Sequence, residues 1–437
     1  MLRRQPLLLC VVLIAYSAAF YKVAHHPAPA LFQAAVMPAQ TTIAPGIATH
    51  FASTQQNIHT HAASLVELGD GRIRAFWFAG SREGAADVEI RSAVFDPAKN
   101  FQGKNSWDAE RSVVTRRATQ QALLRYVKKL GNPVAQRAAD GTLWLFYVTV
   151  SLGGWAGSSI TAITSADDGA TWSPARRLIT SPFMNISTLV KGTPFLFADG
   201  TMGLPVYHEF IGKFSELLRI GTAGEIIAKQ RLSSGHDSLQ PVVLIKNPQQ
   251  ALALMRYAGE PPMRIIATAT DDAGQHWSAP VKTALANPNA AIAGVALSGG
   301  RLVLVFNDTE SERDALSLAV SADGGASWKT VYQLEDQRGP PMESARYAQL
   351  AGDLAKVTDA AIVDASGYAK SAQRIKCASQ YDGQHCGFEF SYPYLIQAHS
   401  GDFHLVYTWN RSHIKHVQFT RAWLDNQIEK SSHAPLH

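Results

Sequence analysis

The chain has 437 residues, of which 46% are hydrophobic and 17% are charged, and its formal net charge is +5. This balance excludes an intrinsically disordered chain, and three cysteines are too few to staple a disulfide scaffold of this length. A single long apolar run excludes a multi-span membrane protein, and no run of like charges suggests a nucleic-acid-binding tail.

The first 24 residues form a targeting segment. Arg3 and Arg4 precede an uncharged stretch from Gln5 to Tyr21. This pattern is typical of a signal peptide, and its length is at the lower edge of a membrane span. We therefore expect an N-terminal apolar signal or anchor helix and an exported chain, either anchored in the inner membrane facing the periplasm or cleaved and free in the periplasm or outside. The Ala- and Pro-rich residues 25–50 are expected to be a tether.

Three copies of a Ser/Thr-x-Asp-x-Gly-x-x-Trp motif follow, beginning at Ser165, Thr270 and Ser321. The Asp side chain can accept hydrogen bonds from backbone amides further along the turn, and the Gly permits a positive φ. The Trp adds a large apolar surface that a neighbouring sheet can cover. Because a strand-like run precedes each copy, we expect each motif to be a hairpin turn within a β-sheet.

The motif spacing predicts the architecture. The starts are 105 and 51 residues apart, so a period near 51 with one silent unit explains both intervals. Such a period in β-rich sequence indicates a propeller of four-stranded blades. We expect an all-β, six-bladed β-propeller over residues 51–430, with residues 336–384 inserted between blades five and six. The expected blades centre on residues 61–107, 130–180, 185–232, 235–285, 288–334 and 385–425.

Cys377 and Cys386 lie close together in a polar stretch. In an oxidising compartment a disulfide between them is expected, and the alternative is a pair of buried thiols. The sequence contains no Cys/His spacing of a zinc site, no nucleotide-binding loop and no dinucleotide fingerprint. We therefore expect neither a metal nor a cofactor.

The three motifs on this spacing resemble the Asp boxes of the sialidase (neuraminidase) superfamily, and the resemblance covers nearly all of the chain beyond the tether. It implies a terminal sugar whose carboxylate is clamped by three arginines, a Tyr nucleophile assisted by a Glu base, and an Asp as acid and base. In that family the boxes lie on the blade periphery, away from the site, so the fold alone does not settle the function.

The resemblance carries over to the first five blades residue by residue. His61 stands where the first arginine is expected, which is a departure, and Arg82 can supply a cation from the same blade. Asp87 is the natural match for the acid and base. Arg256 and Arg313 match the second and third arginines, and a guanidinium fork suits a carboxylate.

The nucleophile and its base fall in later blades. Tyr392 matches the nucleophile, although a Pro follows it where the family has Ser, and Arg411 is a further possible anion contact. The base Glu falls at Gln240, whose amide cannot accept a proton, so Glu209 is the expected replacement. Two histidines near the same inner strands can shuttle protons, namely His208 and His236.

These residues predict an exo-acting glycoside hydrolase that removes a terminal acidic sugar from extracytoplasmic glycans. One alternative is a lyase on uronic-acid polymers, which can use His and Tyr side chains as base and acid. Another is a glycan-binding propeller without catalysis. The expected partners are a carbohydrate and, if the N-terminal segment is uncleaved, the membrane, with no nucleic acid. The chain is expected to be a monomer.

Overall fold

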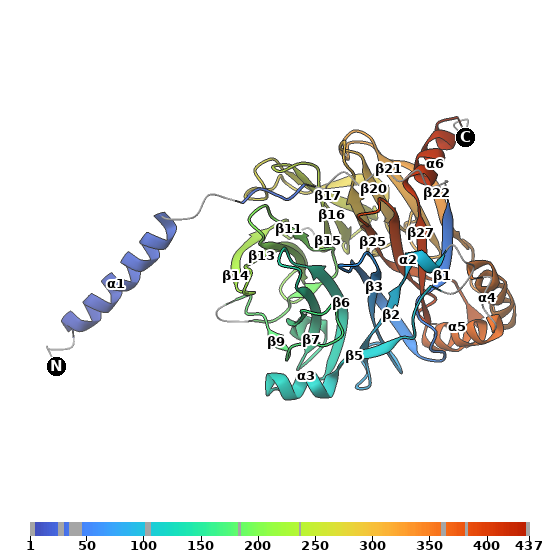
Figure 1. Cartoon of the computed structure of the whole chain (residues 1–437), viewed down its shortest axis with the longest axis horizontal. Helices are drawn as coiled ribbons and strands as arrows, with labels where there is room; N and C mark the ends of the chain where they lie inside the picture. The colour runs from blue at the N-terminus through green and yellow to red at the C-terminus, as the bar shows by residue number, and fades with distance from the viewer. Residues whose placement is uncertain are drawn as a thin grey trace.

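A computed structural model of the chain describes residues 5–24, 30–34, 46–100, 106–181, 185–235, 237–359, 364–380 and 383–433. Six antiparallel sheets surround a common centre (Figure 1). The inner strand of each sheet contacts the neighbouring sheet, and the sixth sheet contacts the first, which closes the ring. The predicted all-β, six-bladed propeller is therefore confirmed.

The first three blades follow the chain in order, from the inner strand outward. Blade one consists of β2 (His59–Glu67), β3 (Ile73–Gly80), β4 (Glu89–Phe95) and β5 (Arg111–Thr115). Blade two consists of β6 (Lys129–Arg137), β7 (Leu143–Val150), β8 (Ser158–Ser165) and β9 (Arg176–Arg177). Blade three consists of β10 (Leu189–Val190), β11 (Phe195–Leu196), β12 (Met202–His208), β13 (Phe214–Ile220) and β14 (Ile226–Arg231).

The last three blades continue the ring. Blade four consists of β15 (Ser238–Ile245), β16 (Ala251–Tyr257), β17 (Arg264–Thr270) and β18 (Val281–Ala286). Blade five consists of β19 (Ala293–Ala296), β20 (Leu302–Phe306), β21 (Ala315–Ser321) and β22 (Lys329–Asp336). Blade six consists of β25 (Phe390–Gln397), β26 (Phe403–Trp409), β27 (His413–Phe419) and β1 (Ile47–Phe51).

The sixth blade joins the two ends of the propeller sequence. Its outermost strand is β1, which pairs antiparallel with β27 from Ile47 opposite Phe419 to Phe51 opposite Lys415. The propeller therefore begins at Ile47 rather than at residue 51, and the last part of the expected tether is a strand. Because strands from both ends of the propeller sequence pair in this blade, backbone hydrogen bonds hold the first and the last strand of the ring together.

Burial falls from the second strand of a blade toward its edge. Every residue of β3 and of β7 is buried, because a neighbouring blade covers each face of these strands. The outermost strand β14 is almost entirely exposed or half-buried. The hydrophobic core thus lies between blades, and the inner strands are left to line the central channel.

The three sequence motifs form the same turn. In the first copy Ser165 Oγ donates to Asp167 Oδ1 at 2.7 Å, and the amide of Thr171 donates to the same oxygen at 2.8 Å. The second and third copies repeat both bonds around Asp272 and Asp323. The Thr171 hydroxyl also donates to the Asp167 carboxylate. This bond and the two others lower the pKa of Asp167, and the bond from the hydroxyl contributes most. The boxes are structural turns between the third and fourth strands of blades two, four and five.

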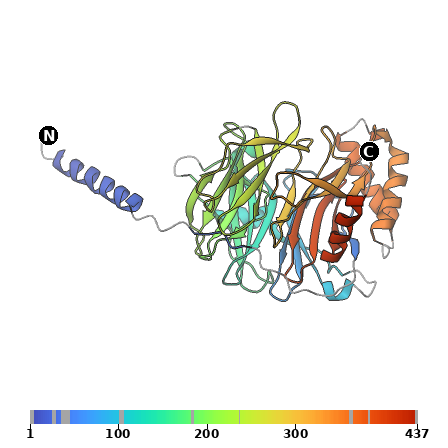
Figure 2. The same ribbon diagram turned by 90° about the horizontal axis from the view of Figure 1, so that it is seen from above.

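The segment between blades five and six is a helical hairpin. It contains α4 (Ser344–Thr358) and α5 (Ala365–Gln380), flanked by β23 (Met342–Glu343) and β24 (His385–Cys386), and it lies outside blade six (Figure 2). Cys377 and Cys386 form a disulfide with a Cα–Cα distance of 5.0 Å. The disulfide joins the last turn of α5 to β24.

Four shorter or terminal helical segments complete the described elements: α2 (Pro97–Asn100), α3 (Arg116–Leu123), a 3-10 turn (Trp155–Gly157) and α6 (Arg421–His433). At the N-terminus residues Gln5–Ala24 form α1. No helix in the described parts of the chain combines the length and the hydropathy that crossing a membrane requires.

A short segment ahead of the propeller is bound to blades three and four. Phe32 is 1% exposed and packs against Phe195 and Phe197 at centroid distances of 5.6 and 5.4 Å. The Phe32 amide donates to the carbonyl of Pro248 at 2.8 Å. This part of the expected tether is therefore packed on the propeller.

Candidate active site

Each inner strand of the propeller has a residue in the left-handed backbone region close to its start, either in its first four residues or up to four residues before it. Their φ angles run from 39° to 58°, in Ala62, Asn132, Ser187, Gln240, Asn289 and Tyr392. In β2, β6, β15 and β25 this residue coincides with a shift in strand register, as in a β-bulge. Because a bulge redirects side chains and the six positions are equivalent in the blades, these residues surround one mouth of the channel.

A chain of hydrogen bonds crosses this mouth. Gln240 Nε2 lies 3.3 Å from the hydroxyl oxygens of both Tyr392 and Tyr207, and Asn132 Nδ2 donates to the Tyr207 hydroxyl at 3.2 Å. Arg256 Nη1 donates to Gln240 Oε1 at 3.1 Å, which sets the orientation of the amide. Gln240 therefore offers a donor to the Tyr392 oxygen and cannot remove its proton.

Three arginines from three consecutive blades converge beside Tyr392. Arg256 Nε donates to the side-chain oxygen of Asn289 at 2.6 Å, and Arg313 Nη2 donates to the backbone oxygen of Asn289 at 2.7 Å. Arg313 and Arg411 both interact electrostatically with Tyr392. Burial, and next the charge of Arg256, lowers the pKa of Arg313. Such close like charges favour an anionic ligand.

Glu389 organises two of these arginines. Its Oε2 accepts from Arg411 Nε at 2.8 Å and from Lys376 Nζ of α5, while Arg313 Nη1 lies 3.7 Å from Oε1. Ser391 Oγ donates to Oε1 at 3.0 Å. Although burial opposes ionisation, Lys376 and then Arg411 hold the pKa of Glu389 well below its usual range. Because three cations surround this single carboxylate, the cluster keeps a net positive charge that can attract an anionic ligand.

His61 packs directly on Tyr392, with ring centroids 4.3 Å apart, and its Nδ1 lies 3.0 Å from Thr408 Oγ1. Burial, reinforced by the charge of Arg411, lowers the pKa of His61 well below its ordinary value. Burial likewise lowers the pKa of His59 to about 4. Where the resemblance expects an arginine, the site therefore has a neutral imidazole, and Arg411 brings the third guanidinium from blade six.

Glu209 directly follows β12 of blade three and interacts electrostatically with Arg256. Its amide donates to Ser187 Oγ at 2.9 Å, next to the start of the inner strand of blade three. Burial raises the pKa of Glu209, and the opposing charge of Arg256 is the largest factor that lowers it. A carboxyl that keeps its proton more readily than usual suits a general acid.

Asp87, the predicted acid, is exposed on the loop between β3 and β4. Its two oxygens accept from the amide and the hydroxyl of Ser81, both at 2.9 Å, so Asp87 closes the β3–β4 loop. Glu83, in the same loop, interacts electrostatically with Arg411 and with Glu209. Of these two loop carboxylates, Glu83 is the one whose charge acts on the arginine cluster.

Two further predicted residues, Arg82 and His208, lie outside this network. Arg82 is exposed on the β3–β4 loop. His208 Nε2 lies 2.5 Å from Glu216 Oε2, and Glu216 also pairs with Lys229 at 2.9 Å, so the imidazole belongs to an ion-pair network within blade three. His236 lies outside the described residues. The proton-shuttle interpretation of His208 therefore has no geometric support.

Lys191 forms the floor below the site. It follows β10 of blade three, and its Nζ donates at 2.8 Å to the carbonyl of Pro393 in the opposite blade. The same amine lies over the rings of Tyr392 and Tyr394, at 5.9 and 5.2 Å from their centroids. Burial lowers the pKa of Lys191 to about 7. The side chain thus crosses the channel directly beneath Tyr392.

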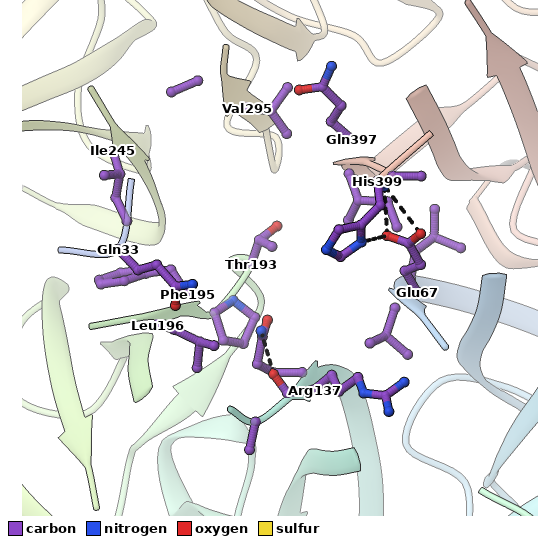
Figure 3. A pocket seen from close by; sticks show the side chains of 18 of the residues that line it. Gln33, Glu67, Arg137, Thr193, Phe195, Leu196, Ile245, Val295, Gln397 and His399 are labelled. Atoms are coloured by element: carbon purple, nitrogen blue, oxygen red, sulfur yellow. Dashed lines mark hydrogen bonds and ion pairs between the residues drawn. The ribbon is translucent and has the colours of Figure 1, made fainter. Parts of the chain in front are cut away.

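The other mouth of the channel holds a cavity lined mainly by the ends of the inner strands (Figure 3). Its volume is about 820 Å³, and the ends of the inner strands line it, including Leu65, Val243, Val295 and Ile396. At its rim His399 Nδ1 lies 2.6 Å from Glu67 Oε2, and the His399 side chain is 90% exposed. Among the described residues no cluster of metal-ligating side chains occurs at either mouth.

Comparison with known proteins identifies the class. Residues 71–405 match the family described as BNR repeat-like domain, so the chain belongs to that family. It is a β-propeller built from BNR (Asp-box) repeats. No curated protein is similar enough in sequence to match it.

Solved structures agree on the fold. The chain is similar to the Hadza microbial sialidase Hz136, at 15% identity and a TM-score of 0.60 over 83% of this chain and 66% of that one. It is also similar to a protein of unknown function from Dyadobacter fermentans (13% identity, TM-score 0.62, 86% and 100% of the two chains). A third is the NanB sialidase from Streptococcus pneumoniae (9% identity, TM-score 0.57, 92% and 72%). At these identities the likeness concerns the fold.

Sequence reasoning missed several members of the site: Asn132, Tyr207, Asn289, Lys376, Glu389 and the electrostatic role of Glu83. The sequence did contain one signal of the bulged positions. Three of the bulged inner strands carry the bulge residue directly before a proline, as Asn132-Pro133, Gln240-Pro241 and Tyr392-Pro393. The proline after Tyr392, interpreted as a departure from the family, is therefore part of a pattern shared by inner strands.

Proposed function

We propose that the protein is an exo-acting glycoside hydrolase that removes a terminal acidic sugar from a glycan. The observation that carries this proposal is the convergence of Arg256, Arg313 and Arg411 around Tyr392 at one mouth of the channel. Guanidinium groups bind a carboxylate with pairs of charge-assisted hydrogen bonds. The positive charge of the three arginines is larger than the negative charge of the buried Glu389, so the cluster can still attract an anion.

In this proposal the sugar carboxylate lies among the three arginines, and the Tyr392 oxygen attacks the anomeric carbon. The glycosidic bond breaks as Glu209 gives a proton to the leaving oxygen, and water later releases the sugar. The amide of Gln240 donates to the Tyr392 oxygen, and Arg313 and Arg411 stabilise negative charge on it. These groups make the Tyr392 oxygen easier to deprotonate, so its proton passes to water as the new bond forms, while His61 stays neutral and packs against the Tyr392 ring.

The test is release of 4-methylumbelliferone from its α-glycoside with N-acetylneuraminic acid, compared with a neutral glycoside. The wild-type protein is expected to hydrolyse the acidic glycoside selectively. Tyr392→Phe is expected to lower kcat by at least about 100-fold, because the nucleophile is removed. The matched control is Tyr126→Phe, an exposed tyrosine on which the mechanism does not depend.

Other outcomes would point elsewhere. An ultraviolet-absorbing unsaturated product from a uronic-acid polymer would replace the hydrolase with a lyase. Retention of acidic glycans without turnover, unchanged by Tyr392→Phe, would indicate a binding propeller. Either result would overturn the proposal, as would hydrolysis that persists in the Tyr392→Phe variant.

We also propose that residues 1–24 direct export and that the glycan is extracytoplasmic. The basic and apolar pattern of this segment supports the proposal, and so does the Cys377–Cys386 disulfide, because such bonds persist in oxidising compartments. Fractionation of a bacterial host is the test. Full-length protein is expected outside the cytoplasm, and a chain without residues 1–24 is expected to stay inside.

A further inference from the structure

The segment between blades one and two has an unusual charge distribution. No Asp or Glu occurs between Glu110 and Asp140, a stretch that contains seven basic residues. They are Arg111, Arg116, Arg117, Arg125, Lys128, Lys129 and Arg137. The +5 charge of the whole chain is therefore concentrated locally, and part of this stretch forms a surface beside the candidate site.

Large apolar side chains protrude among these cations. Leu124, which ends α3 with a left-handed φ of 48°, is 93% exposed, and Tyr126 is 56% exposed. Leu152, in the loop between β7 and β8, is 77% exposed. Exposed leucines at two neighbouring loop tips are uncommon on a soluble surface and often mark a contact site.

The two loops form one surface. Arg125 Nε donates to Ser151 Oγ at 2.8 Å, and the amide of Lys128 donates to the carbonyl of Val150 at 2.7 Å. These bonds fix Leu152 next to the segment that follows α3. We name this surface the basic–apolar ledge and define it by Arg116, Arg117, Leu124, Arg125, Tyr126, Lys128 and Leu152.

The ledge borders the candidate active site. Lys129, the first residue of β6, lies over the ring of Trp155 at 3.8 Å and interacts electrostatically with Glu209 and Glu83. Trp155 in turn covers Gly131, where an added Cβ would come within 2.6 Å of the indole. Because Gly131 precedes the site residue Asn132 in β6, the ledge is one side of the mouth. In Figure 1 α3 stands at the edge of the ring beside β5 and β9.

We propose that the basic–apolar ledge docks on an anionic lipid surface and presents the mouth of the channel to sugars carried there. The cations match negatively charged headgroups, and aliphatic tips that enter the headgroup region gain from burial. A soluble polyanion explains the arginines and lysines but gives no reason to expose Leu124 and Leu152. The inference does not depend on hydrolysis, because docking requires the surface and not the reaction.

The experiment uses the full chain with Cys10→Ser, so that a single new cysteine can carry an environment-sensitive fluorophore. The probe is placed at Leu152→Cys or, as the matched control, at Val281→Cys, which replaces a valine 60% exposed on the edge strand of blade four. A local probe separates contact by the ledge from any contact by α1. The vesicles are phosphatidylglycerol with phosphatidylcholine, or phosphatidylcholine alone.

With anionic vesicles the emission at position 152 is expected to shift to the blue, and the shift is expected to weaken with added salt. Position 281 is expected to show no shift. Adding Leu124→Ser and Arg125→Ala to the Leu152→Cys chain is expected to weaken vesicle binding at least tenfold, while Val281→Ser leaves it unchanged. Circular dichroism verifies that each variant is folded.

Three results would overturn the proposal. They are no shift at position 152, an equal shift at position 281, and an equal shift with phosphatidylcholine alone. A soluble sulfated polysaccharide that shifts the probe while anionic vesicles do not would assign the ledge to a glycan instead. Loss of hydrolysis has no bearing on any of these readings, so a failure of the proposed function remains distinguishable.

Discussion

The two mouths of the central channel differ in chemistry more than in shape. At the mouth opposite the candidate site, called the far mouth here, the ends of the inner strands surround a cavity of about 820 Å³, which aliphatic side chains line together with Glu67, Arg137 and Gln397. At the opposite mouth, arginines, tyrosines and amides from several blades meet through hydrogen bonds. The candidate site therefore lies where these polar and charged side chains meet and not at the mouth that holds the cavity. The contrast teaches that a concentration of charged and polar side chains, rather than the volume of a cavity, identifies the candidate site.

The largest difference between the mouths is expected in turnover. Arg313→Ala removes a guanidinium beside Tyr392, and a charge-assisted hydrogen bond contributes about 1.5–3 kcal/mol, so kcat/KM is expected to fall by roughly 10- to 100-fold. The matched variant at the far mouth is Arg137→Ala, which lines the cavity there. Steady-state kinetics on the acidic glycoside is the measurement.

The same two variants also test whether the two mouths differ in function. Equal losses in Arg313→Ala and Arg137→Ala, with both proteins folded, would remove the distinction between the mouths. A loss confined to Arg137→Ala would move the site to the far cavity.

The next effect concerns stability. Glu389→Gln leaves Lys376, Arg313 and Arg411 without their buried carboxylate, and breaking a buried ion pair costs about 3–5 kcal/mol. We expect the free energy of unfolding to fall by about this amount in urea titrations. Adding Lys376→Met to Glu389→Gln is expected to restore part of it, because a buried cation that has lost its carboxylate is removed. A fall below about 1 kcal/mol in the single variant would contradict the described network.

A smaller effect depends on pH through Lys191. Burial lowers its folded-state pKa from 10.5 to about 7, so between these values the unfolded chain binds more protons than the folded one. Stability therefore rises with pH across this window, by roughly 2 kcal/mol between pH 7 and pH 9 for this group. Lys191→Met is expected to flatten the rise and to stabilise the protein at pH 7. An unchanged pH dependence would show that the amine is hydrated or paired.

The smallest effect is expected at the far mouth. Glu67→Gln removes the carboxylate that pairs with the largely exposed His399, and a solvent-exposed pair contributes about 0–1 kcal/mol. Neither the urea midpoint nor turnover is expected to change measurably. A large loss in either would mean that the far mouth has a role that its exposed ion pair does not reveal.

The sequence predicted the propeller because its signals are local and repeated. Each Asp box is a short turn whose hydrogen bonds come from its own side chains, and its period marks the blades. The helical hairpin and β1 were harder to predict. α4 and α5 interrupt the period, and β1 is identified as a strand only through its pairing with β27, far away in sequence.

The site was predicted in part. His61, Gln240, Arg256, Arg313, Arg411 and Tyr392 come together at one mouth, each close to an inner strand. Lys376 and Glu389 were not foreseen, because their pairing joins the inserted helix α5 to blade six and leaves no local pattern. Asp87 and Glu83 share one loop, and only the hydrogen bonds of Ser81 distinguish them.

The most direct test of the account is a crystal structure of the protein soaked with N-acetylneuraminic acid. The account predicts that the sugar carboxylate lies within hydrogen-bond distance of Arg256, Arg313 and Arg411, with its anomeric carbon next to the Tyr392 oxygen. A sugar bound in the far cavity, or bound with its carboxylate away from these arginines, would contradict it.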